Sequence, residues 1–148
     1  MKHLAIIMDG NRRWAKQRGF FAWQGHQQGV HNVEMVIQYC LEKNISYLSL
    51  YALSIENLKR PEIELHYLFS LIKDLKKRAD EFIKNGVKVR FIGDLSLVTS
   101  DIQADLREIE QMTRLSDRLI CNFLFCYGSG QEIVNAAQKY AEEGIHHT

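Results

Sequence analysis

Residues 8–14 bring together the groups that phosphate and magnesium chemistry requires. The segment reads Met-Asp-Gly-Asn-Arg-Arg-Trp and follows a short apolar run. Asp9 supplies a carboxylate that can hold Mg²⁺, Gly10 lets backbone N–H groups approach phosphate oxygens, and the two arginines can bind those oxygens bidentately. The simpler alternative is an Asp-Gly turn followed by solvated arginines. The segment alone leaves both interpretations open.

A second polar segment, residues 51–61, reads Tyr-Ala-Leu-Ser-Ile-Glu-Asn-Leu-Lys-Arg-Pro. It supplies a hydroxyl at Ser54, a carboxylate at Glu56, an amide at Asn57 and a guanidinium at Arg60. Taken alone, the segment favours cap or turn roles for Ser54 and Asn57 and a surface position for Arg60. Its expected position beside the first segment favours a shared site instead.

Three other segments carry weaker signals. His26, after Gly25, could donate a hydrogen bond to phosphate, although a single loop histidine is more often solvated. Gly93-Asp94 is expected to form a turn that shapes the floor of a pocket. Residues 127–130, Tyr-Gly-Ser-Gly, lack the full dinucleotide fingerprint, so NAD binding is not inferred.

The composition predicts one compact domain, residues 1–148, with no overall electrostatic attraction to nucleic acid or to an anionic membrane. The chain has 148 residues, 46% of them hydrophobic, and 19 Lys and Arg against 18 Asp and Glu give a formal net charge of +1. Three cysteines without a CxxC pair, and an opening without a signal-peptide pattern, favour a reducing cytoplasm. The apolar runs are shorter than the roughly 20 residues that span a bilayer, so no transmembrane anchor is expected.

Hydrophobic spacing predicts four strand–helix units. Strands are expected over residues 4–8, 45–51, 87–92 and 119–125, and helices with apolar faces over residues 30–41, 65–83, 100–112 and 129–140. The second helix is expected to begin at Pro61, where Glu62 and Glu64 complement its N-terminus, and to end at Gly86. Capping boxes at Ser100-x-x-Gln103 and Ser129-x-x-Glu132 are expected to open the last two helices, and Gly144 to end the last one.

This alternation predicts an α/β fold with a mostly parallel sheet covered by helices. Because ligands bind at the carboxyl ends of such strands, the segments that follow the four strands are expected to share one surface. The apolar face of residues 65–83 is expected mainly to join the core, with a second use as a pocket wall if the substrate is a hydrocarbon. The aromatic cluster Phe20, Phe21 and Trp23 favours core packing over a lid that touches a membrane.

Together these segments resemble the cis-prenyltransferase family, whose bacterial members are undecaprenyl diphosphate synthases. The resemblance covers essentially the whole chain. It rests on residues 3–16, reading HLAIIMDGNRRWAK, on Gly25-His26, on residues 51–61, on Phe91–Asp94 and on Tyr127-Gly128. The first and third of these motifs are highly specific together.

The resemblance implies a transferase that adds isopentenyl diphosphate repeatedly to an allylic diphosphate such as farnesyl diphosphate, with a cis double bond formed at each step. The expected product is undecaprenyl diphosphate, a lipid carrier for the cell wall. By similarity, Asp9 would hold Mg²⁺ and assist departure of the allylic diphosphate. Asn57 matches a position that assists proton removal, where an amide serves better as an orienting group than as a base.

The other matching positions are expected to bind substrate. They are Gly10, Asn11, Arg12, Arg13, Trp14, His26, Ser54, Ile55, Glu56, Leu58 and Arg60. In the family, the growing prenyl chain runs through a hydrophobic tunnel between the sheet and the long helices. The resemblance also implies a homodimer in the cytoplasm, with peripheral membrane contact through the product at the inner face.

The sequence departs from the family pattern at three places. Ala22 replaces a basic residue, whose contact Arg18 could supply, and Cys126 replaces an asparagine, while an arginine common after Tyr-Gly is absent from Gly128–Gly130. The family continues with an Arg-x-Gly-Gly-Glu-like segment, so the chain is expected to match the N-terminal part of the enzyme. Two alternatives remain: an inactive or binding-only prenyl diphosphate fragment, and a phosphohydrolase using Asp9 as nucleophile, which usually needs a second Asp where Asn11 stands.

Overall fold

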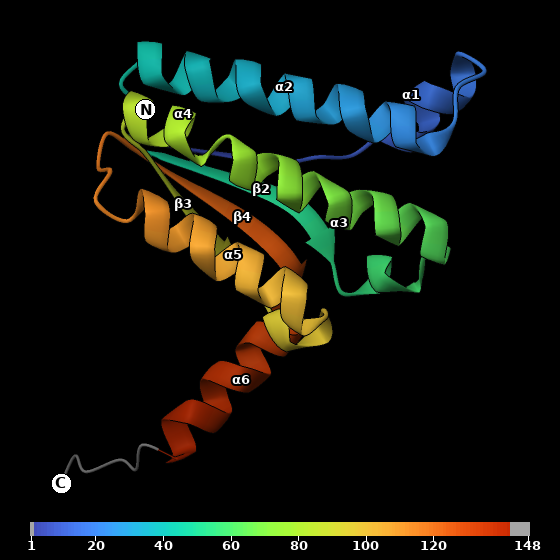
Figure 1. The fold of residues 1–148 in the computed structure, drawn as a ribbon. Helices are drawn as coiled ribbons and strands as arrows, with labels where there is room; N and C mark the ends of the chain where they lie inside the picture. The colour runs from blue at the N-terminus through green and yellow to red at the C-terminus, as the bar shows by residue number, and fades with distance from the viewer. Residues whose placement is uncertain (1, 143–148) are drawn as a thin grey trace, which may run out of the picture.

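A computed structural model of the chain describes residues 2–142 (Figure 1). The strands are β1 (His3–Ile7), β2 (Tyr47–Ser54), β3 (Val87–Ile92) and β4 (Leu119–Tyr127), and the helices are α1 (Asn11–Gln17), α2 (Ala22–Glu42), α3 (Glu62–Lys77), α4 (Ala79–Asn85), α5 (Ser100–Thr113) and α6 (Ser129–Glu142). Two short 3₁₀ turns, η1 (Glu56–Lys59) and η2 (Leu95–Leu97), complete the described elements. None of the helices within these residues combines the length and apolar character that a bilayer crossing requires.

The four strands form one sheet in the order β1-β2-β4-β3, and every neighbouring pair is parallel. This arrangement confirms the predicted α/β fold and its parallel sheet. It also places the carboxyl ends of β1 and β2 side by side, since Ile7 lies opposite Tyr51 in the register. The two polar segments that follow these strands therefore begin at the same edge of the sheet.

Alternate side chains of β2, β4 and β3 are buried, and they form one core with α2, α3, α4 and α5. Leu48, Leu50 and Leu119 are among the fully buried members, and burial of each such side chain stabilises the fold by about 1.5–3 kcal/mol. The opposite face of the sheet is less buried and carries polar contacts, such as that from the Asn122 amide to the Ser49 hydroxyl. In Figure 1, α6 extends away from the sheet.

Four local expectations differ from the structure. Residues 11–17 form a helix rather than a loop, and α2 begins at Ala22 instead of residue 30. The second strand runs two to three residues later than expected, because the N–H groups of Ile45 and Ser46 bond to Cys40 and Lys2 instead of a neighbouring strand. The long helix expected over residues 65–83 is broken at Arg78, whose guanidinium pairs with Glu34 of α2 and Glu81 of α4.

Neither capping box forms as predicted. The N-cap of α5 is Thr99, and the Gln103 side chain donates to the carbonyl of Val98. At the start of α6, the Glu132 carboxylate accepts a hydrogen bond from the Tyr127 hydroxyl. Gly144, expected to end the last helix, lies outside the described residues.

Candidate active site

A cavity of about 1370 Å³ opens between the sheet and helices α1 to α4. The segments after β1 and β2 give it a cationic end, and most of the remaining lining is apolar, although His31, Glu34, Asp74 and Arg78 also line it. The apolar walls come from all four strands and from α2, α3 and α4. They include Ile37, Leu68, Leu71, Ile72, Leu75, Phe82, Phe91, Phe123 and Phe125. The face of residues 65–83 therefore has both uses that the sequence suggested, because Ile72 and Phe82 belong to the core and also line the cavity.

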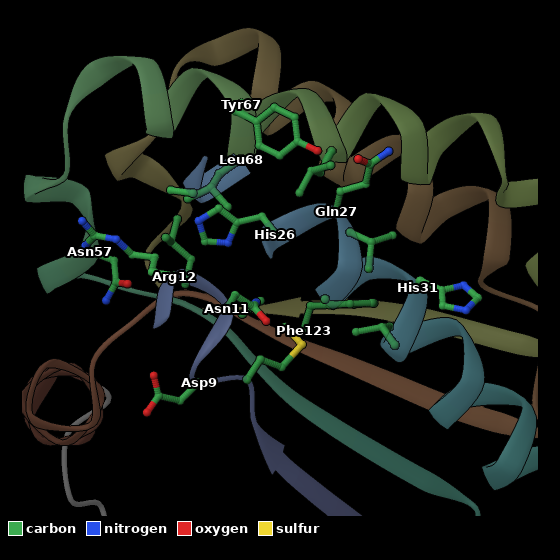
Figure 2. A pocket seen from close by; sticks show the side chains of 18 of the residues that line it. Asp9, Asn11, Arg12, His26, Gln27, His31, Asn57, Tyr67, Leu68 and Phe123 are labelled. Carbon is green, nitrogen blue, oxygen red and sulfur yellow. The ribbon is translucent and has the colours of Figure 1, made fainter. Parts of the chain in front are cut away.

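The structure brings most of the predicted site residues to this one cavity. Those that line it are Asp9, Gly10, Asn11, Arg12, Arg13, His26, Ser54, Asn57 and Arg60. Figure 2 shows Asp9, Arg12 and Asn57 toward one end, while His31 lies toward the other. The two polar segments thus line one cavity instead of forming separate surface turns.

Four predicted positions do not line the cavity: Trp14, Ile55, Glu56 and Leu58. Trp14 borders a separate hollow of about 270 Å³, and the Arg18 guanidinium lies 4.5 Å from the centre of its ring. Leu58 packs against the core, and the Ile55 N–H donates to the carbonyl of Tyr127. Direct substrate contact at these four positions stays a prediction from the resemblance.

The turn after β1 holds the Asp9 carboxylate at the rim. Gly10 has φ +98°, a left-handed conformation that L side chains rarely adopt, and it lets α1 begin at the next residue. One Asp9 oxygen accepts from the Gly10 N–H at 2.6 Å, and the other lies 2.6 Å from Nη2 of Arg13. Both side chains are about three quarters exposed, so a ligand can reach this pair from solvent.

Close packing of α1 on α2 positions the residues of the first segment. A Cβ at Gly25 would lie 2.1 Å from the backbone oxygen of Asn11, and one at Gly29 would lie 2.7 Å from its side-chain nitrogen. These two glycines therefore provide the space in which Asn11 sits. His26, next to Gly25, is buried at this same contact and lines the cavity.

We expect Gly25→Ala to lower the free energy of unfolding by about 1–3 kcal/mol, because the added methyl group meets backbone atoms that have little room to move. Gly130→Ala is the matched control, since a Cβ there has no atom within 4 Å. Urea denaturation measures both variants. Equal urea midpoints for Gly25→Ala and the wild type would contradict the close approach of α1 to α2 at Gly25.

A buried carboxylate that the sequence analysis did not single out lies at the centre of the polar end. Glu64, in the first turn of α3, has a side chain only 7% exposed. Its Oε1 lies 3.0 Å from His26 Nε2, 3.1 Å from Arg60 Nη1 and 3.7 Å from Arg12 Nε. Its position four residues after Arg60, a spacing at which opposite charges often pair, was the signal in the sequence that could have identified it.

Burial is the main cause that lowers the pKa of His26 from its ordinary value of 6.5. The hydrogen bond to Glu64 and its negative charge act in the opposite direction, and the positive charges of Arg60 and Arg12 lower the pKa further. His26 is therefore neutral in the folded protein at neutral pH. The neutral ring donates to Glu64 through Nε2–H, which leaves Nδ1 as an acceptor.

The lowered pKa of His26 predicts a pH-dependent stability. Below pH 6.5 the unfolded chain takes up a proton that the folded protein does not bind, so the free energy of unfolding falls from there down to the folded pKa. Above pH 6.5 this contribution is fully present. Urea midpoints measured on both sides of pH 6.5 should show the fall in the wild type and in the exposed control His66→Gln. His26→Gln should lack this component, and an unchanged pH dependence in that variant would contradict the assignment.

The second polar segment forms a short chain of hydrogen bonds. The backbone N–H and the side-chain amide of Asn57 both donate to the Ser54 hydroxyl oxygen. Hydrogen bonds from the backbone N–H of Glu56 and from the Ser54 hydroxyl lower the pKa of the Glu56 carboxyl. Ser54 thus connects the amide of Asn57, which lines the cavity, with a carboxylate outside it, and these hydrogen bonds fix the position of the Asn57 side chain.

The loops that follow β3 and β4 contact the elements around the cavity without lining it. Gly93 closely approaches the carbonyl of Phe125, and the Asp94 carboxylate accepts from the Ser96 N–H. Neither residue lines the cavity, so their expected place at the pocket floor is wrong. The carbonyl of Tyr127 accepts from the Tyr51 hydroxyl as well as from Ile55, and so fixes the second polar segment.

The aromatic cluster around the start of α2 does not enter the core. Phe20, Phe21 and Trp23 are 46%, 73% and 44% exposed, so the expectation of core packing is wrong. Phe20 and Phe21 line the cavity, and Ala22 joins them there. Arg18 does not line it, because its guanidinium stacks on Trp14, so it does not supply the basic group expected near Ala22.

Within residues 2–142, no three His, Cys, Asp or Glu side chains converge on a common metal position. Asp9 offers an exposed carboxylate beside the cationic groups of the cavity. Mg²⁺ commonly keeps several waters and binds through one or two carboxylates together with substrate phosphates. The residues present therefore fit a magnesium ion that is held jointly by Asp9 and a bound diphosphate.

Comparisons with known proteins give one consistent family. The family model described as undecaprenyl diphosphate synthase matches residues 7–148. An isoprenyl transferase of Campylobacter jejuni (strain RM1221) is 42% identical over 146 residues, which are 98% of this chain and 66% of that protein. A ditrans,polycis-undecaprenyl-diphosphate synthase of Legionella pneumophila (strain Paris), named as specific for (2E,6E)-farnesyl diphosphate, is 40% identical over 93% of this chain and 58% of its own length.

Two solved structures are also similar. Lavandulyl diphosphate synthase from Lavandula x intermedia, in complex with dimethylallyl diphosphate, has a TM-score of 0.90 and 31% identity, and the match covers 96% of this chain and 61% of that one. A probable undecaprenyl diphosphate synthase from Campylobacter jejuni has a TM-score of 0.79 and 36% identity, with 96% and 62% covered. The chain thus spans less than two thirds of the length of the relatives that it matches here.

Proposed function

Because the chain belongs to the undecaprenyl diphosphate synthase family of isoprenyl transferases, we propose that it carries the allylic diphosphate site of such an enzyme. The proposed reaction condenses isopentenyl diphosphate with farnesyl diphosphate to give a cis-polyprenyl diphosphate, with undecaprenyl diphosphate as product. One observation carries this proposal: a single cavity joins a cationic end to a long apolar body. A prenyl diphosphate has the same division between an anionic head and a hydrocarbon chain.

The cationic end suits the diphosphate head. Arg12, Arg13 and Arg60 line it, and guanidinium groups bind phosphate oxygens in bidentate fashion. The first N–H groups of α1 lie in the same rim and add backbone donors. Asp9 would hold Mg²⁺, which when bound neutralises charge that develops on the departing diphosphate.

The apolar body suits the prenyl chain. Phe91 of β3 and Phe123 and Phe125 of β4 line it, with the Phe91 ring in contact with the other two, and leucines of α3 line it as well. In the proposed condensation the allylic C–O bond breaks, a C–C bond forms to the isopentenyl unit, and that unit loses a proton. Asn57 orients the isopentenyl unit through the amide that Ser54 holds.

For the complete protein we extend the proposal to a homodimer in the cytoplasm that meets the inner face of the membrane through its product. The family resemblance supports this extension. A cell-wall role follows from the same product. A binding-only form is a second candidate, because the cationic and apolar lining of the cavity suits a prenyl diphosphate whether or not that ligand is elongated.

Incorporation of radiolabelled isopentenyl diphosphate into lipid tests the proposal, with farnesyl diphosphate as acceptor and with Mg²⁺ present or chelated. We expect polyprenyl diphosphates that form only with Mg²⁺. If the 148-residue chain binds farnesyl diphosphate without elongating it, the binding-only candidate is supported for this form. Release of phosphate from simple monoesters without prenyl transfer would instead support a phosphohydrolase and contradict the proposal.

A further inference from the structure

Glu64 lies where a carboxylate is unexpected, at the cationic end of a cavity proposed to bind an anion. Its side chain is 7% exposed, and burying a charge is costly unless it is paired and hydrogen-bonded. By charge alone it would weaken diphosphate binding, because it neutralises nearby positive groups. Its presence there requires a compensating role.

The contacts of Glu64 indicate what that role is. Its Oε1 meets groups from three different segments: Arg12 of α1, His26 of α2 and Arg60, which follows η1. Glu64 itself belongs to α3. One carboxylate therefore ties together the four segments that form the cationic end.

These contacts leave donors available for a ligand. Arg12 approaches Glu64 through Nε and Arg60 through Nη1, and within residues 2–142 neither guanidinium makes another hydrogen bond or ion pair. A guanidinium has five N–H donors, so each arginine keeps several for phosphate oxygens. The Arg12 side chain is 57% exposed, which leaves it accessible.

We propose that Glu64 is a positioning residue that holds Arg12, His26 and Arg60 in the arrangement that binds a diphosphate. This inference rests on the proposed function of the cavity and deepens it. The carboxylate does not touch the diphosphate. It fixes the orientation of the groups that do, so that their side chains lose less conformational freedom on binding.

Glu64→Gln tests the proposal because it removes the charge and keeps the size of the side chain. Glu62→Gln is the matched control: it removes the same charge from the same turn of α3, and Glu62 is exposed. Calorimetry with Mg²⁺ and inorganic pyrophosphate measures the affinity of the 148-residue chain. We expect Glu64→Gln to weaken binding by about tenfold or more and Glu62→Gln to leave it within about twofold.

A positioning role for Glu64 and a purely electrostatic effect of its charge predict opposite changes in pyrophosphate affinity. If Glu64 acted only as a negative charge, its removal would strengthen pyrophosphate binding, and equal or tighter binding by folded Glu64→Gln would overturn the proposal. If Glu64→Gln does not fold, Glu64→Asp replaces it, since it keeps the charge but withdraws the carboxylate by one methylene. The same loss of affinity is then expected, and unchanged binding would overturn the proposal.

A second readout does not depend on any ligand. The pKa of His26, measured by NMR, should fall in Glu64→Gln and stay unchanged in Glu62→Gln, because Glu64 raises it while Arg60 and Arg12 lower it. An unchanged His26 pKa in Glu64→Gln would contradict the contact. If the wild type bound no pyrophosphate, the proposed function would fail, whereas the shift at His26 would still show whether Glu64 organises this cluster.

Discussion

Replacement of Asp9 by alanine is expected to reduce prenyl transfer by about 10³-fold, the largest effect of any single change in this site. Asp9 lies at the rim, where it is exposed and paired with Arg13. Its loss removes the carboxylate proposed to hold Mg²⁺ against the diphosphate. It also releases Arg13, whose guanidinium is no longer fixed by the contact at 2.6 Å.

The measurement is initial velocity across a range of Mg²⁺ concentrations, using the complete protein. Because Asp9 is exposed, its replacement should leave thermal stability close to that of the wild type. Asp101→Ala is a suitable control, since it removes an exposed carboxylate from the first turn of α5, away from the cavity. Undiminished turnover by Asp9→Ala, or an equal loss in Asp101→Ala, would contradict the role of Asp9.

Replacement of Asn57 by alanine is expected to lower kcat by about 10²-fold while KM for the allylic diphosphate changes little. The backbone N–H of residue 57, which donates to the Ser54 hydroxyl, remains in this variant, so the 3₁₀ turn should persist. The side-chain amide is the part that is lost. A large fall in kcat would therefore be caused by the loss of the side-chain amide and not by local unfolding of the turn.

A double-mutant cycle separates the two members of this pair. If Asn57 acts through the position that Ser54 gives it, Ser54→Ala should lower kcat too, and the double variant should lose less than the product of the two single effects. Strictly multiplicative losses would show that the two side chains act independently. A rise in KM with unchanged kcat for Asn57→Ala would assign the amide to ground-state binding instead.

The polar motif at residues 8–14 and the strands could be predicted from the sequence because both depend on short, continuous segments. Apolar runs at residues 4–8 and 87–92 predict strands, and the parallel sheet follows from the alternation of such runs with helices. The expectation that the first of these strands is buried is wrong, because β1 ends the strand order and none of its residues is buried. Asp9, Arg12 and Asn57 were identified because polar residues of these types follow predicted strands, and their expected roles came from the family resemblance. The rule that ligands bind at carboxyl ends then placed them at one edge, and they line one cavity.

Other features depended on contacts between segments far apart in the chain. The break between α3 and α4 at Arg78 could not be predicted from a Gly or Pro, because neither residue occurs there. The Arg78 guanidinium pairs with Glu34, which lies 44 residues away in the sequence. The exposure of Phe21 depends on what packs beside the start of α2, which its aromatic character does not specify. Periodicity records whether a side chain is apolar, but not which element will cover it.

The sequence by itself determined the α/β class, the parallel direction of the strands and the polar residues at the strand ends, because each follows from spacing within a few residues. The tertiary structure alone decided that one buried carboxylate, Glu64, joins α1, α2 and the end of η1. That contact spans 38 residues to His26, and an acidic residue in a first helical turn has the same local pattern whether it faces solvent or a cluster of cations. Only the packing of the helices on the sheet distinguishes the two.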